Sequence, residues 1–142
     1  LAIKRAALPL PGAVALLSPW TDLQGTGASC ETKRAADPLI SPEGLGSCAA
    51  AYLGDADAAD PGASPLNGDF AGFPPLLIEV GTREVLLSDA TRLAERAAAA
   101  DVDVTLHAWQ GMVHVFPNIW FALSEGPEAI AEIGAFVRRH TA

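Results

Sequence analysis

Three apolar runs along the chain have the length and residue types of β-strands. The first, from Ala13 to Leu17, has no polar alternation, the second runs from Pro75 to Val80, and the third, from Val102 to Trp109, alternates apolar and polar positions. A continuous apolar run is typical of a strand buried on both faces of a parallel sheet, whereas alternation indicates one wetter side. We therefore predict that the third run lies at a sheet edge.

Helical patterns follow these runs. Ser41 is a favourable N-cap, and the sequence after it predicts a helix from Pro42 to about Leu53 that stops at Gly54. An amphipathic to alanine-rich helix is predicted from Glu84 to Ala100. A last helix with an apolar stripe is predicted from about Pro127 to Arg139.

The order of these elements predicts an α/β fold. Strand, helix and strand between residues 75 and 109 form a βαβ unit, whose two strands are parallel. We expect a mostly parallel sheet of about three strands flanked by helices, with a long surface loop over 55–73, which is rich in Asp, Pro and Gly. The first strand has no predicted neighbour on one side, so another segment should cover it.

Composition excludes several classes of partner. The chain has 142 residues, 50% hydrophobic, with 17 acidic and 9 basic side chains and a net charge of −8. It has no basic stripe of the kind that binds phosphate backbones, so we expect no nucleic-acid partner. Its apolar stretches are far shorter than the roughly 20 residues that span a bilayer, so we expect no membrane segment. The two cysteines, Cys30 and Cys48, are expected to be free thiols of a cytoplasmic protein.

The first seven residues resemble the tail of a helix rather than a signal sequence, because Lys4 and Arg5 interrupt a short apolar stretch. We therefore expect the chain to be part of a longer polypeptide.

An acid and a base follow the second and third predicted strands. Glu84 lies in Gly-Thr-Arg-Glu after one strand, and His114 lies in Gly-Met-Val-His-Val-Phe after the next. Open α/β sheets carry their chemistry at the carboxyl ends of the strands, so these side chains are expected at one rim. Together they are two-thirds of a Ser-His-acid triad.

Other candidates are weaker. Asp89 is the alternative acid, but its position more than a turn into the predicted helix favours a solvated surface charge. His107 is expected to be a packed strand side chain, and His140 a charge at a helix C-terminus. The local sequences of Ser18 and the other serines predict turn, cap or surface roles. No Gly-x-Ser-x-Gly elbow occurs, so no nucleophile is nominated.

Seven segments in order resemble the C-terminal half of the bacterial hormone-sensitive-lipase family, also called family IV, of α/β-hydrolase esterases. The matching segments are Leu17-Ser18-Pro19-Trp20-Thr21-Asp22-Leu23, Asp37-Pro38-Leu39, Ala51-Tyr52-Leu53-Gly54, Asp60-Pro61 with Ser64-Pro65-Leu66, Phe73-Pro74-Pro75-Leu76-Leu77-Ile78, Gly81 to Glu84 with Leu86-Leu87, and Gly111-Met112-Val113-His114-Val115-Phe116-Pro117. The resemblance implies that residues 1–142 are the C-terminal portion of a single α/β-hydrolase domain.

The resemblance also implies an incomplete catalytic machine. Glu84 would be the triad acid and His114 the base of a serine carboxylesterase, with no metal and no organic cofactor. The nucleophilic serine and the oxyanion loop would come from an upstream segment or a second fragment, so the chain would be inactive alone. Trp20, Met112 and Phe116 would line the pocket for a small-molecule ester substrate.

Three further hypotheses stay open. The chain could be a non-catalytic small-molecule-binding protein on the same fold, or a stand-alone α/β interaction domain. The edge-like run from Val102 to Trp109 also suggests a homodimer, because pairing between chains needs a free strand edge.

Overall fold

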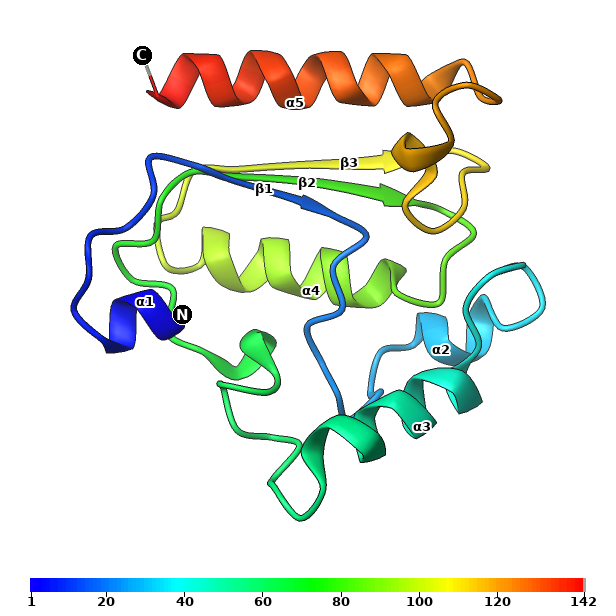
Figure 1. Cartoon of the computed structure of the whole chain (residues 1–142), viewed down its shortest axis with the longest axis horizontal. Helices are drawn as coiled ribbons and strands as arrows, with labels where there is room; N and C mark the ends of the chain where they lie inside the picture. The colour runs from blue at the N-terminus through cyan, green and yellow to red at the C-terminus, as the bar shows by residue number, and fades with distance from the viewer. Residues whose placement is uncertain (142) are drawn as a thin grey trace.

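The computed structural model describes residues 1–141 and contains a three-stranded sheet between two layers of helix (Figure 1). The elements in chain order are α1 (Ala2–Arg5), β1 (Val14–Leu17), α2 (Ser29–Thr32), α3 (Pro42–Leu53), η1 (Pro65–Asn67), β2 (Leu76–Gly81), α4 (Leu87–Ala98), β3 (Val104–Trp109), η2 (Phe116–Ile119) and α5 (Glu125–Thr141). The predicted α/β class is confirmed.

The sheet has the order β1-β2-β3 and all of its strands are parallel. Leu16, Ile78 and Leu106 are register neighbours across the three strands. Helix α4 covers one face and α5 the other, and both run along the strands (Figure 1). The carboxyl ends of the strands therefore meet at one rim, as the βαβ order predicted.

Burial follows strand position. Every residue of the central strand β2 is buried, whereas all four residues of β1 are only partly buried. Ile78 and Val80 of β2 pack with Ala90 and Leu93 of α4 in the main core. Within the described residues β1 has a neighbour on one side only, in line with the expectation that another segment covers it.

The helix predicted from Pro42 is confirmed at both ends. The Ser41 hydroxyl accepts a hydrogen bond of 3.1 Å from the Gly44 amide, and the helix stops before Gly54, which has a φ of 54°. Cys30 and Cys48 are both free thiols. No helix among residues 1–141 combines the length and the apolar character needed to cross a bilayer.

Three local predictions need correction. Residues 55–73 do not form a purely surface loop, because η1 and the turn after it bury Leu66 and Phe70 in the core. The polar, glycine-containing stretch from Gly25 to Ala36 contains the short helix α2, which the sequence pattern did not predict. Helix α4 begins at Leu87 rather than at Glu84, because residues 82–86 form turns that precede it.

Candidate active site

Glu84 and His114 form a hydrogen-bonded pair at the carboxyl ends of β2 and β3. His114 Nδ1 lies 3.0 Å from Glu84 Oε2. The Glu84 side chain has no exposed surface, whereas that of His114 is 21% exposed. A carboxylate can only accept here, so Nδ1 carries the proton and Nε2 is left as the acceptor. The pair has the geometry of the acid and base of a triad.

Two further donors hold the Glu84 carboxylate. Its Oε1 accepts a bond of 2.7 Å from the Ser18 hydroxyl and one of 2.5 Å from the Gly81 amide. Glu84 lies before α4, and these side-chain and backbone donors orient its carboxylate.

Ser18 joins the acid to the loop that carries the base. Its hydroxyl donates to Glu84, and the same oxygen accepts a bond of 2.9 Å from the Val115 amide. Both residues have a left-handed backbone, with φ of 46° at Ser18 and 45° at Val115. That conformation is rare for a β-branched residue and indicates strain held by surrounding contacts. The turn role predicted for Ser18 was incomplete.

Close backbone approach at the rim requires glycine. A Cβ at Gly81 would overlap the Met112 carbonyl, so the end of β2 can lie against the histidine loop only with a hydrogen at this position. Gly111, with a φ of 77°, starts that loop, and its amide donates to the Thr82 hydroxyl at 2.9 Å. These contacts fix the acid and base loops to each other.

Asp37 supports the acid loop from a distant part of the chain. Its Oδ2 accepts a bond of 2.9 Å from the Val85 amide, next to Glu84. Its Oδ1 accepts bonds of 3.0 Å from the amides of Leu39 and Ile40. The carboxylate therefore links two segments that the sequence pattern treated as unrelated. The Asp-Pro-Leu motif was the available signal for it.

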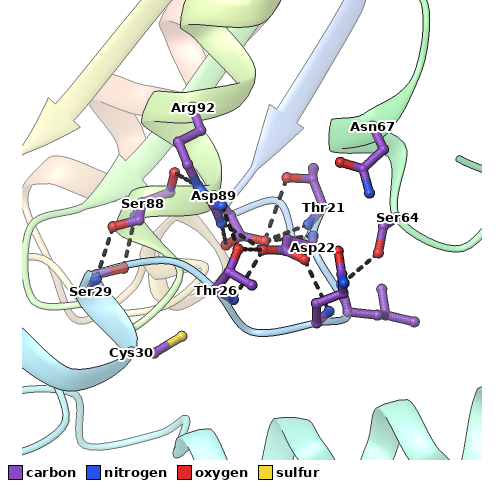
Figure 2. Close-up of polar contacts among 12 residues, drawn as sticks. Thr21, Asp22, Thr26, Ser29, Cys30, Ser64, Asn67, Ser88, Asp89 and Arg92 are labelled. Carbon is purple, nitrogen blue, oxygen red and sulfur yellow. Dashed lines mark hydrogen bonds and ion pairs between the residues drawn. The ribbon is translucent and has the colours of Figure 1, made fainter. Parts of the chain in front are cut away.

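Asp89, the alternative acid, belongs to a separate buried network, shown in Figure 2. Its Oδ2 accepts hydrogen bonds of 2.8 and 2.9 Å from the amides of Thr21 and Asp22, and its Oδ1 accepts one of 3.1 Å from Arg92 Nη2. The predicted solvated surface charge is wrong, because Asp89 is 1% exposed in the first turn of α4. It holds the turn after β1 in place.

The surroundings of this network shift the pKa values of two carboxyl groups in opposite directions. Burial raises the pKa of Asp89 above its ordinary value, although the Thr21 and Asp22 amides act against the rise. Burial acts in the same way on Asp22, but hydrogen bonds from Thr26 and Arg92 outweigh it and hold the Asp22 pKa below its usual range.

The three residues assigned to a substrate pocket have different surroundings. Phe116 has no exposed surface, and its ring centroid lies 5.4 Å from that of Trp109, which is the position of a core side chain. Trp20 and Met112 are partly exposed. Trp20 borders a cavity of about 180 Å³ that is lined by the turn after β1, by α2 and by the start of α3.

Comparison with known proteins identifies the family. A family described as alpha/beta hydrolase fold matches residues 1–118. This chain belongs to the α/β-hydrolase family.

Its α/β-hydrolase relatives include proteins named as ester-cleaving enzymes. An acetyl-hydrolase of Streptomyces hygroscopicus is 43% identical over 140 residues, which cover 99% of this chain and 47% of that protein. An esterase of Acinetobacter venetianus is 37% identical over 139 residues, covering 96% of this chain and 45% of that protein.

Solved structures of related proteins support the same family. The crystal structure of an esterase from the bacterial hormone-sensitive lipase family matches with a TM-score of 0.97 and 45% identity, over 99% of this chain and 48% of the other. The resemblance to this group of α/β-hydrolases is thus confirmed. The chain spans about half the length of the curated relatives it matches.

Replacing Ser18 with alanine is expected to lower the free energy of unfolding by about 1–3 kcal/mol, because the change leaves Glu84 Oε1 with one donor and removes the acceptor of the Val115 amide. Urea unfolding measures the loss. The imidazole ¹⁵N chemical shifts of His114 are also expected to change in S18A, since Ser18 joins the acid to the loop that carries the histidine. Ser41→Ala is the matched control, because it removes only the cap of α3 and should lower stability by about 1 kcal/mol with the His114 shifts unchanged. Equal His114 shifts in S18A and S41A would contradict the positioning role.

Proposed function

We propose that this chain supplies the acid and base of a Ser-His-Glu triad that hydrolyses carboxylic esters. The observation that carries the proposal is the 3.0 Å contact between His114 Nδ1 and a fully buried Glu84 carboxylate. A structural ion pair needs no particular tautomer, whereas this one leaves Nε2 free to act as a base, on a side chain that is 21% exposed.

In this mechanism His114 Nε2 accepts the proton of a serine hydroxyl as its oxygen attacks the ester carbonyl. It then returns that proton to the leaving alcohol, and it repeats the cycle with water to release the acid. Glu84 holds the imidazole tautomer and stabilises the imidazolium that forms. The bonds from Ser18 and Gly81 keep the carboxylate oriented throughout.

The serine and the oxyanion loop are proposed to lie on an upstream segment or a docked second fragment. Residues 1–142 would then be the C-terminal portion of one α/β-hydrolase domain. The single neighbour of β1 and the double length of the relatives support this division. Relatives named acetyl-hydrolase and esterase favour small-molecule esters of short to medium acyl chains, with Trp20 and Met112 beside the reacting group.

A serine-directed fluorophosphonate tests this division of the triad. The 142-residue chain alone is expected to stay unlabelled and to show no hydrolysis above background. The protein that also carries the upstream segment is expected to be labelled on a serine of that segment and to hydrolyse the ester. Intact mass and peptide mapping locate the label.

Two results would contradict the proposal. Labelling of the 142-residue chain would place the nucleophile within it. An unlabelled longer protein would instead favour a non-catalytic binding protein on the same fold.

The proposal includes a homodimer that pairs through β3, whose outer edge has no strand neighbour among the described residues. Light scattering is expected to give twice the protomer mass, and only monomer at high concentration would rule it out. Cytoplasmic localisation stays a prediction.

A further inference from the structure

Three side chains with metal-ligand chemistry meet on the sheet face that α5 covers. Glu79 of β2 and His107 of β3 are register neighbours, and Glu132 comes from α5. One oxygen or nitrogen from each lies within 4.8 Å of the others. His107 Nδ1 is 2.5 Å from Glu132 Oε2 and 3.6 Å from Glu79 Oε1. Three elements distant in sequence therefore present ligand atoms to one point.

Two of these atoms are buried oxygens that no donor in residues 1–141 satisfies. Glu79 is 1% exposed, and its Oε2 accepts a hydrogen bond from the Trp109 indole, but its Oε1 has no hydrogen-bond partner. Glu132 Oε2 is also without one, despite its short distance to His107. An unpaired buried carboxylate oxygen is costly, and a single imidazole N–H serves at most one of the two.

We propose that Glu79, His107 and Glu132 bind a divalent transition-metal ion of the Zn²⁺ class. A dication would satisfy both orphaned oxygens and balance the two carboxylate charges. The mixed nitrogen and oxygen donors suit Zn²⁺, whereas Ca²⁺ and Mg²⁺ prefer all-oxygen shells.

Two of the distances between ligand atoms are near those found at such an ion. Ligand atoms at tetrahedral Zn²⁺ lie roughly 3.3 Å apart, and the two nitrogen–oxygen distances of 2.5 and 3.6 Å bracket that value. The Trp109 indole already orients Glu79 through its other oxygen, as outer-shell donors do at metal sites. His107 thus becomes a ligand rather than the packed side chain predicted for it.

The ion would fasten α5 to the sheet. Its three ligands are separate from Glu84 and His114, so this role is independent of the triad and of ester cleavage. The hydrolytic mechanism proposed above uses no metal, and the ion proposed here has a structural role only.

A titration of chelator-treated protein with Co²⁺ and then Zn²⁺ tests the site. One Co²⁺ per chain is expected to bind with visible d–d absorption and to be displaced by Zn²⁺. His107→Ala and Glu132→Gln are each expected to weaken binding at least about tenfold, since even the loss of an outer-shell partner has that effect. The matched controls, Glu128→Gln on the same helix and His140→Gln at its end, should bind as the unchanged protein does.

Thermal unfolding gives a second readout. A fixed concentration of Zn²⁺ is expected to raise the Tm of the unchanged protein and of E128Q by the same amount and that of E132Q by less, because the stabilisation that an ion gives increases with its affinity for the folded state. Glu132 is 37% exposed and glutamine keeps its shape, so E132Q carries the test should H107A fail to fold. No saturable binding, or equal binding by E132Q and E128Q, would overturn the proposal.

Discussion

Replacing His114 with alanine is expected to lower kcat for ester hydrolysis by at least about 10⁴-fold, because no other group would take the serine proton. The imidazole is bonded to the buried Glu84 carboxylate at the rim, with Nε2 left as the acceptor. The test uses the protein that carries the upstream segment. Initial rates over a range of ester concentrations separate kcat from KM, and the loss should fall on kcat.

His140→Gln is the control for the loss of an imidazole. That residue lies in the last turn of α5, where its ring packs against Phe136 at 4.7 Å, and its replacement should leave kcat unchanged. Fluorophosphonate labelling of H114A should slow in parallel with hydrolysis, since both reactions need the activated serine. A variant without His114 that keeps its rate within tenfold would remove this histidine from the mechanism.

Glu84→Gln and Asp89→Asn form a matched pair that distinguishes the two candidate acids. E84Q is expected to lower kcat by about 10³–10⁴-fold, because an amide facing Nδ1 disturbs the tautomer that leaves Nε2 as a base. D89N should change kcat by less than about tenfold, since Asp89 bonds the turn after β1 and not the histidine. Rates of both variants on the same ester decide between the two acids. A large loss in D89N with none in E84Q would reverse the assignment.

The Asp89→Asn variant is also expected to have a lower free energy of unfolding than the unchanged protein. D89N replaces an acceptor of two buried amides and faces Arg92 with an NH₂ group, so the free energy of unfolding should fall by about 1–3 kcal/mol. Because burial raises the pKa of Asp89, its contribution to stability is fully present below the unfolded-state pKa. That contribution is lost as pH rises through the folded-state value, and this part of the pH dependence should be missing in D89N. Urea unfolding at several pH values measures it.

The sheet and the rim were predictable because the period of the apolar positions encodes them. The run around Ile78 and the alternation around Leu106 predicted parallel neighbours, and the loops that end those strands had to carry Glu84 and His114 to the same edge. The N-cap at Ser41 was equally readable, since capping is a contact between residues three apart.

The positions that sequence reasoning misjudged depend on contacts between residues far apart in the chain. Ser18 bonds Glu84 across 66 positions, and Asp89 reaches the amide of Thr21 across 68. A Ser-Pro sequence and an acidic residue in a helix have good local explanations, so nothing nearby in the chain signals the second role. The buried oxygen of Glu79 is a similar case, because its strand pattern gives no sign that α5 brings Glu132 beside it.

The hydrogen bonds that join Ser18, Glu84 and His114 all close within one continuous piece of polypeptide. A proposed nucleophile on a different piece would meet an acid and base that are already oriented before the two pieces touch. Assembly of the halves would then be the step that switches hydrolysis on. Two such halves, each fused to one of a pair of interacting proteins, could serve as a split enzyme whose colour reaction reports that the pair has met.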